Sequence, residues 1–142
     1  MKSKVGGLGW VAGLALFAMT LALGACASGK SDLAGTQWNL AALNGQAPLG
    51  GSGRLTLGFE SESRFGGNSG CNVFGGSYTL TGSALKLRDM SSTLRACAEQ
   101  GLNDQEAQYY AALSNTTAFE LAGGQLLLKD ASGAILLAFD PA

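Results

Sequence analysis

The sequence predicts an α+β domain: a curved antiparallel sheet or open barrel, with one helix packed on it and one disulfide. Three observations support this fold class. Short segments of alternating apolar and polar residues, separated by glycine-containing turns, fill most of the chain from residue 33 onward. One segment with helical spacing interrupts them, and two of the three cysteines lie in the same part of the chain. The length suffices for one modest core.

The N-terminus has the pattern of a bacterial export signal. Lys2 and Lys4 precede an uncharged apolar stretch from Val5 to Leu23, which is typical of a secretory signal peptide. The stretch ends in Leu-Gly-Ala-Cys at residues 23–26, which resembles a lipobox, and the resemblance implies cleavage before Cys26 and acylation of its sulfur and amino group. Each buried CH₂ of such chains contributes roughly 0.8 kcal/mol to membrane binding. An ordinary signal peptide with a chance cysteine, or an uncleaved anchor, is the alternative.

We therefore expect a lipoprotein signal peptide at residues 1–25, a lipid-anchored tether at 26–32 and one folded domain at 33–142. Ala27 follows the lipidation site, where an aspartate would favour retention in the inner membrane, so we expect an outer-membrane anchor facing the periplasm. The membrane is then a partner through the anchor. The chain has nine basic and ten acidic residues, and the basic ones do not form a stripe. The charge pattern therefore does not favour a nucleic-acid partner.

Two single strands and two hairpins are expected, at residues 36–45, 53–60, 76–90 and 125–140. The clearest pattern is in the second of these, where Leu55, Leu57 and Phe59 alternate with residues of the opposite face. The first ends in Asn-Gly, which is a turn signal after a strand. The alternation predicts strands that bury one face and expose the other.

A helix is expected at residues 103–113, where four residues recur at helical spacing: Ala107, Tyr110, Ala111 and Leu113. Asn103 is the expected N-cap, Glu106 would close a capping box, and Leu102 would staple onto Ala107. Tyr109 and Tyr110 are expected in the core and at its rim, rather than as a pair that stacks on a cofactor.

The side chains available narrow the possible chemistry. The chain has no histidine, which excludes Ser-His-Asp and Cys-His catalysis and histidine-based zinc sites. Glu60 and Glu62 could form an acid–base pair on one strand face, but solvated charges at a strand end are the favoured interpretation. The glycine-rich segments lack both the lysine of a phosphate loop and a following helix. We therefore expect no enzymatic activity, no catalytic residue, no metal site and no cofactor.

Cys71 and Cys97 are the two cysteines of the predicted domain. The export signal implies an oxidising compartment, where an even pair is usually bonded. A redox-active pair is the alternative, but the spacing is not C-x-x-C and neither lysine nor histidine adjoins Cys71 to lower the pKa of its thiol. Arg95, two residues before Cys97, is a weak argument for activation. A structural disulfide is therefore the favoured interpretation.

Two cysteine-containing motifs occur in order along the chain. The first is Gly-Cys-Asn-x-Phe-x-Gly-x-Tyr, formed by Gly70, Cys71, Asn72, Phe74, Gly76 and Tyr78. The second is Thr-x-x-Ala-Cys, formed by Thr93, Ala96 and Cys97. With the tryptophan strand before them and the apolar hairpin after them, they resemble the META domain family, which includes the HslJ-like heat-shock lipoproteins. The resemblance covers residues 33–139, and the chain departs from it at Leu94-Arg95, where the family often has Arg-Met.

The resemblance implies a small, mainly β envelope protein without established enzymatic activity, in a family associated with heat shock and novobiocin resistance. It also implies a fold similar to the lipoprotein pilots of secretion machinery, which suggests binding of a partner protein or an acyl chain. A groove for such a ligand is expected to be lined by Trp38, Phe59, Phe74 and Tyr78. Gly75 and Gly76 are expected bend or bulge positions, with Asn72 satisfying backbone groups at the bend.

Two classes of function remain open. The favoured one is an envelope-anchored, non-enzymatic lipoprotein that acts in stress response or binds a partner protein or an acyl chain. The alternative is a protein inhibitor of an envelope hydrolase, either lysozyme or a protease. An inhibitor needs an exposed and rigid loop, and the candidate is Gln46–Gly53, although its glycines leave it poorly preorganised.

Overall fold

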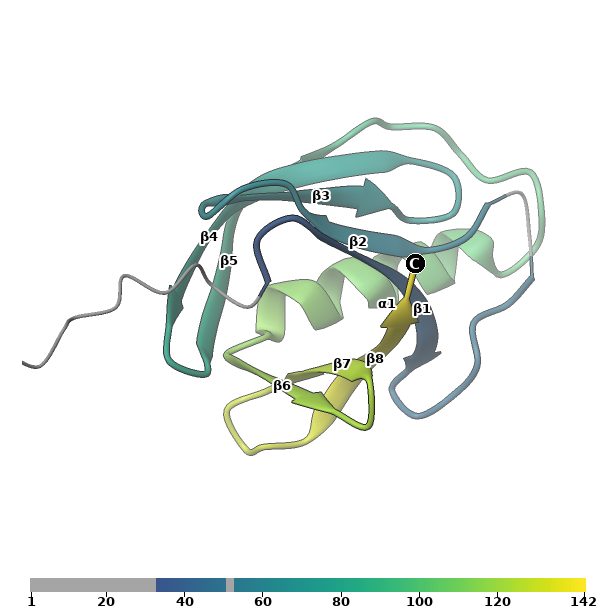
Figure 1. Ribbon diagram of the computed structural model, residues 1–142. Helices are drawn as coiled ribbons and strands as arrows, with labels where there is room; N and C mark the ends of the chain where they lie inside the picture. The colour runs from purple at the N-terminus through teal and green to yellow at the C-terminus, as the bar shows by residue number, and fades with distance from the viewer. Residues whose placement is uncertain (1–32, 51–52) are drawn as a thin grey trace, which may run out of the picture.

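The computed structural model describes residues 33–50 and 53–142, so the expected signal peptide, the lipidation site Cys26 and the tether lie outside the described residues. The described chain forms eight strands and one helix (Figure 1). In chain order they are β1 (Thr36–Leu43), β2 (Thr56–Phe59), β3 (Arg64–Asn68), β4 (Val73–Thr81), β5 (Ala84–Ser92), α1 (Leu102–Asn115), β6 (Ala118–Ala122), β7 (Gln125–Lys129) and β8 (Ile135–Pro141).

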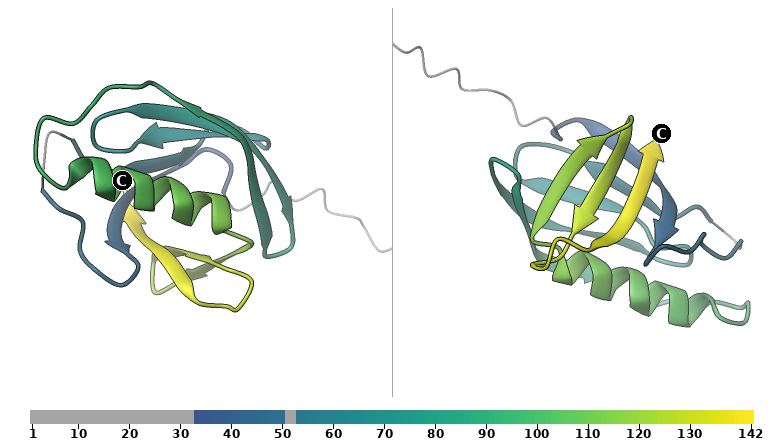
Figure 2. Two further views of the ribbon diagram at one scale, coloured as in Figure 1. Left: turned by 180° about the vertical axis from the view of Figure 1, so that it is seen from behind. Right: turned by 90° about the horizontal axis from the view of Figure 1, so that it is seen from below.

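The strands form one antiparallel sheet that curves until its ends meet. Each strand pairs with its neighbours in sequence, and β8 pairs with β1. The narrowest junction lies between β5 and β6, which are joined by the single residue pair Ala84 and Ala118. Helix α1 contacts β1, β5 and β8, and Figure 2 shows it running along one side of the curved sheet. The predicted curved antiparallel sheet with one packed helix is confirmed.

The core consists of the inward-facing residues of the strands and one face of the helix. Leu55, Leu57 and Phe59 are at most 4% exposed, as their alternation predicts. The C-terminal hairpin adds four fully buried residues: Leu126, Leu128, Leu137 and Phe139. Tyr109 of α1 completes this core, with its ring centroid 5.7 Å from that of Phe74 in an edge-on arrangement. Sheet and helix therefore share one hydrophobic core.

The predicted ligand groove is filled by its own side chains. Trp38, Phe59, Phe74 and Tyr78 are all buried members of the core, and none is more than 8% exposed. Phe59 and Tyr78 pack edge to face with their centroids 5.0 Å apart. The prediction of a groove lined by these four residues is wrong, because all four belong to the buried core of the sheet.

Strands β3 and β6 were not among the predicted elements. β3 contains Gly66 and Gly67, and glycine weakens the pattern of a strand. A Cβ at Gly67 would lie 2.1 Å from the backbone oxygen of Thr56, so the glycine permits a close approach of two backbones. β6 has no fully buried residue, and its five residues all pair with β7. Neighbouring strands, and not local patterning, specify both elements.

The start of α1 differs from the prediction. Gly101, with φ +84°, precedes the helix, and no side chain caps it. Asn103 instead accepts a hydrogen bond from the backbone N–H of Cys97 at 3.0 Å, and the Glu106 carboxylate is directed toward the sheet, as described below. The capping box is therefore wrong, and so is the staple, because Ala107 is exposed.

The buried face of α1 is also rotated from the predicted one. It consists of Leu102, Gln105, Glu106, Tyr109, Ala112 and Leu113. Ala107 and Ala111 are exposed, and Tyr110 is half-buried. The expectation that Tyr109 lies in the core and Tyr110 at its rim is confirmed. The polar residues Gln105 and Glu106 belong to this face. The spacing of apolar residues therefore could not identify the buried face correctly.

The register irregularity expected near Gly75 and Gly76 is present, but the extra residue belongs to β5. β4 pairs with β3 without interruption, whereas its register with β5 shifts between Gly75 and Ser77. Across that shift β5 contributes one more residue than β4, and its Asp89 has φ +52°. The alternation of β4 therefore continues, and Phe74, Gly76 and Tyr78 all face the interior.

Replacing Gly76 by alanine is expected to lower the free energy of unfolding by about 2–3 kcal/mol, as overpacking of a core does. A Cβ at Gly76 would lie 2.5 Å from the backbone oxygen of Arg88 and 2.8 Å from the ring of Phe65. Gly75→Ala is the matched control, because its Cβ would meet the nearest atom, the oxygen of Phe65, at 3.3 Å. Urea unfolding measures both, and equal midpoints for the two variants would contradict the prediction.

Candidate functional site

The predicted disulfide is present and joins two irregular segments at one end of the sheet. Cys71 lies in the turn between β3 and β4, and Cys97 lies in the connector between β5 and α1, which comprises residues 93–101. The two Cα atoms are 5.5 Å apart, within the range that the bond requires. The bond fastens the connector to the end of the sheet.

Asn72, next to Cys71, provides the second attachment of the connector. Its side chain pairs with both backbone groups of Arg95: Oδ1 accepts from the N–H at 2.7 Å, and Nδ2 donates to the carbonyl oxygen at 2.9 Å. The same Oδ1 also accepts from the Thr93 hydroxyl at 2.8 Å. Asn72 is only 4% exposed. Asn72 was expected to satisfy backbone groups at the bend of its own strand, and this is wrong, because the backbone groups that its side chain binds belong to Arg95, 23 residues further along the chain.

Glu106 of α1 holds Asn72 in this orientation. Asn72 Nδ2 donates to both carboxylate oxygens, at 2.8 and 3.0 Å. Glu106 Oε1 also accepts hydrogen bonds from the hydroxyls of Ser69 and Tyr110. Ser69 Oγ in turn lies 3.0 Å from the backbone oxygen of Asn72 and 2.8 Å from the Tyr110 hydroxyl. A buried carboxylate is thus satisfied by neutral donors from the sheet and the helix.

Two tyrosines beside this network remain protonated at neutral pH. Burial raises the pKa of Tyr109 well above its ordinary value, and the neighbouring Tyr110 raises it further. Burial also raises the pKa of Tyr110, against hydrogen bonds with Ser69 and Ser92 that lower it. A protonated Tyr110 can donate to Glu106, so the network needs no cation to satisfy the carboxylate.

The hydrogen bonds of this network attach the connector to the sheet and to α1. Ser69, whose hydroxyl donates to the Glu106 carboxylate, is 1% exposed. Among the described residues, every buried side-chain nitrogen and oxygen has a hydrogen-bond partner. The arrangement therefore positions the connector and leaves no polar group free to engage a ligand from within.

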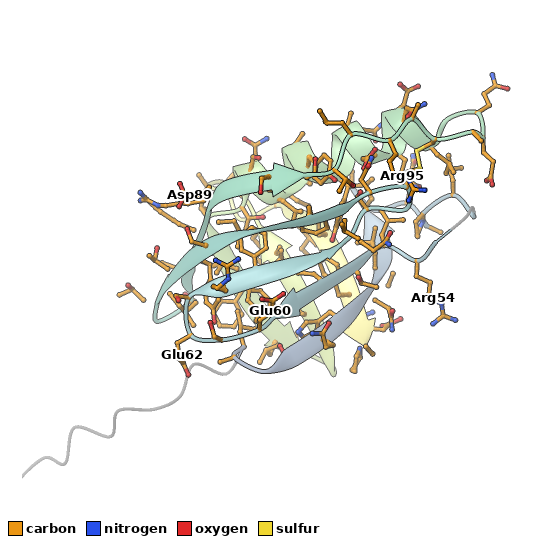
Figure 3. The ribbon with its side chains drawn as sticks, turned by 90° about the horizontal axis from the view of Figure 1, so that it is seen from above. Arg54, Glu60, Glu62, Asp89 and Arg95 are labelled. Atoms are coloured by element: carbon orange, nitrogen blue, oxygen red, sulfur yellow. A yellow bond between two sulfur atoms is a disulfide. The ribbon has the colours of Figure 1, made fainter. Side chains whose placement is uncertain are left out.

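The outer face of the connector is exposed. Residues 93–96 are all exposed, and Leu94 reaches 96%. Val73 of β4, whose backbone pairs with Thr93, is 56% exposed. Figure 3 shows Arg95 and Arg54 toward the same end of the domain, away from Glu62 and Asp89. Exposed apolar residues and two arginines therefore lie toward the end of the sheet that carries the disulfide.

The loop predicted as an inhibitory element lies near this end. Within Gln46–Gly53, residues 51–52 are outside the described ranges, and Leu49 is 53% exposed. Two surface hollows flank Leu49: one of about 280 Å³ beside Gly101 and Gln105, and one of about 450 Å³ beside Leu40 and Leu55. The backbone N–H of Leu49 donates to the side-chain oxygen of Gln105. This is the one side-chain hydrogen bond to the described part of the loop.

The acidic residues Glu60 and Glu62 are exposed. Glu60 lies 4.0 Å from the Arg64 guanidinium in an exposed ion pair, which agrees with the interpretation as solvated charges. Within residues 33–50 and 53–142, no cluster of three or more histidine, cysteine or acidic side chains has the arrangement of a metal site. The helix in those ranges lacks the length and hydropathy needed to cross a membrane.

Sequence reasoning identified Cys71, Asn72, Thr93 and Cys97 but missed the other members of the network: Ser69, Glu106 and Tyr110. Glu106 was assigned to a helix cap because its spacing from Asn103 fits a capping box. Ser69 adjoins the motif, so its position was a usable signal. No local pattern in the sequence links Glu106 to Asn72, because the two residues are 34 positions apart and come together only in the folded protein.

Comparisons with known proteins agree with this architecture. A protein from Burkholderia xenovorans solved by NMR is 30% identical, with a TM-score of 0.60 over 78% of this chain and 83% of that chain. A second NMR structure is 22% identical, with a TM-score of 0.61 over 76% and 90% of the respective chains, and supports the fold alone. No curated protein matches. Residues 31–142 match the model of the META domain, and the chain therefore belongs to the META domain family.

Proposed function

We propose that this protein is a non-enzymatic lipoprotein of the bacterial envelope, anchored in the outer membrane through acylated Cys26, that binds a partner protein in a stress response. The observation that carries the proposal is the connector, which is exposed along its outer face and fixed along its inner face. A surface segment that is ordered before binding loses little conformational entropy when it binds.

The contacts of the motif residues favour a binding role over a catalytic one. Asn72 and Thr93 form hydrogen bonds within the protein, and Cys71 and Cys97 are bonded to each other. An acyl-chain ligand loses its support, because the aromatic residues expected to line its groove are core residues. A partner protein at the end of the sheet that carries Leu94 is therefore the favoured ligand.

Photo-crosslinking at two matched positions tests this proposal in cells. A photoreactive amino acid in place of Leu94 is expected to yield a discrete crosslinked protein. The same residue in place of Leu121, which is 46% exposed on β6, is the control and should not yield it. Cys26→Ser should abolish incorporation of a palmitate analogue and release the protein from membranes. Identical products from both positions, or labelling that survives Cys26→Ser, would contradict the proposal.

Inhibition of an envelope hydrolase is the second candidate function. The specific observation in its favour is Leu94, an aliphatic side chain that is almost fully exposed between two fixed residues. The connector, with a disulfide and paired backbone groups, meets the requirement for a rigid inhibitory segment better than Gln46–Gly53 does.

A further inference from the structure

We propose that residues 93–97 form a substrate-like inhibitory segment for a serine protease with an apolar specificity pocket. Leu94 enters the pocket, and the bond between Leu94 and Arg95 is the reactive peptide bond. This inference deepens the proposed binding function and rests on it, because it names the class of partner and the segment that the partner contacts.

Exposure alone does not carry this inference, since isolated exposed leucines are common on protein surfaces. What distinguishes Leu94 is that both neighbouring residues are fixed to the same buried atom. Oδ1 of Asn72 accepts from the Thr93 hydroxyl at 2.8 Å and from the Arg95 N–H at 2.7 Å. The side chain of Thr93 and the N–H of Arg95, on either side of Leu94, are therefore held, while Leu94 itself is 96% exposed.

The backbone of this segment prolongs β5 beyond its last residue. Thr93 N–H donates to the carbonyl oxygen of Val73 at 3.1 Å, which continues the ladder between β4 and β5. The Asn72 side chain then pairs with the N–H and carbonyl of Arg95 as a neighbouring strand would. Successive side chains of an extended segment point to opposite sides, so Leu94 points outward because Thr93 points toward Asn72. Proteases bind their substrates as extended segments with one side chain in the specificity pocket.

A substrate becomes an inhibitor when cleavage is readily reversed. In the forward step the protease serine Oγ attacks the carbonyl carbon of Leu94, the C–N bond to Arg95 breaks, and the serine proton passes through the protease histidine to the Arg95 nitrogen. In the reverse step the Arg95 amine attacks the ester carbon, the amide re-forms, and the proton returns to the serine oxygen. Re-formation of the bond is fast when the freed amine of Arg95 is held close to the ester carbon.

This fold holds that amine in place. The Arg95 nitrogen is hydrogen-bonded to Asn72, and Cys97, two residues further on, is tied to Cys71 by the disulfide. Asn72 is in turn fixed by the Glu106 carboxylate. The new amino terminus would therefore stay beside the acyl-enzyme ester, where re-formation of the bond competes with hydrolysis by water.

The side chain of Leu94 indicates the subclass of protease. A branched aliphatic side chain fits the apolar pocket of chymotrypsin-like and subtilisin-like enzymes, whereas trypsin carries an aspartate that selects a basic side chain. Leu94→Lys should therefore transfer inhibition from the first group to trypsin. Leu121→Lys places the same charge at the exposed leucine of β6 and is the matched control.

The experiment titrates chymotrypsin, subtilisin and trypsin with the purified full-length protein, using chromogenic peptide substrates. We expect stoichiometric inhibition of chymotrypsin or subtilisin, a loss of at least about 30-fold in inhibition constant for Leu94→Gly, and inhibition of trypsin by Leu94→Lys alone. Thr93→Val removes the hydroxyl bond to Asn72 at an exposed position and should speed cleavage between residues 94 and 95.

Three outcomes would overturn the inference: rapid cleavage of the wild-type segment without inhibition, equal effects of Leu94→Lys and Leu121→Lys on trypsin, or no inhibition of any of the three enzymes. Circular dichroism of each variant verifies that it is folded. Specific photo-crosslinking at position 94 combined with any of these outcomes would retain the proposed binding function and reject the protease as its target. The absence of both crosslinking and inhibition would reject both proposals.

Discussion

Replacing Asn72 by alanine is expected to lower the free energy of unfolding by about 4 kcal/mol, through loss of several buried hydrogen bonds. The side chain is 4% exposed and bonds to Arg95, Thr93 and Glu106. A buried donor or acceptor left without its partner costs about 1–3 kcal/mol, and a charged one costs more. Urea unfolding followed by tryptophan fluorescence measures the difference.

Most of this loss comes from Glu106. In the variant its carboxylate keeps the hydroxyls of Ser69 and Tyr110 but loses the amide that contacts both of its oxygens. Glu106 as a residue is 8% exposed, so water reaches it poorly, and an under-solvated buried charge is among the strongest sources of destabilisation. The backbone groups of Arg95 recover hydrogen bonds from solvent, because that residue is exposed.

Asn115→Ala is the control for this prediction. Asn115 is exposed at the end of α1, and substitution of such a residue usually changes stability by less than about 0.5 kcal/mol. Amide exchange gives a second measurement, because the Arg95 N–H should be protected in the wild type and lose protection in Asn72→Ala. A variant with unchanged unfolding midpoint and unchanged Arg95 protection would show that Asn72 does not fasten the connector.

The sequence predicted those features whose cause lies within a few residues. Leu57 and Phe59 of β2, and Leu55 just before it, alternate along the chain and are buried in the core. The two hairpins follow from apolar runs around turns. β3 was missed because Gly66 and Gly67 carry no strand signal, and the need for Gly67 arises from the Thr56 oxygen across the sheet. The conflict between the Thr56 oxygen and a Cβ at position 67 exists only in the folded protein, where β2 and β3 lie side by side.

In the candidate site, too, features with local causes were predicted and features that depend on the tertiary structure were not. Cysteine count and the expected oxidising compartment predicted the bond between Cys71 and Cys97. The chemistry of asparagine predicted that Asn72 binds backbone, but at the bend of its own strand and not at Arg95. The role of Glu106 was not predictable, because a glutamate three residues after an asparagine at a helix start usually indicates a cap. The exposed position of Leu94 was likewise hidden, since a leucine in an apolar-rich chain is expected to be buried.

Reducing the disulfide is expected to lower the free energy of unfolding by roughly 3–4 kcal/mol in the chain-entropy model. Cys71 and Cys97 are separated by 26 residues, and an open loop of that length gives the unfolded chain conformational freedom that the bond removes. For a domain of this size the melting temperature should fall by about 10–20 °C. Thermal unfolding with and without a reductant measures the effect.

The paired variant Cys71→Ser, Cys97→Ser separates the bond from effects of the reductant and should melt at the temperature of the reduced protein. Because the Asn72 contacts to Arg95 do not involve sulfur, the Arg95 N–H should stay partly protected in this variant, unlike in Asn72→Ala. The two attachments of the connector thus act in different states: the disulfide mainly restricts the unfolded chain, and Asn72 stabilises the folded one. An unchanged melting temperature on reduction, or ready labelling of Cys71 or Cys97 in the native oxidised protein, would contradict this account.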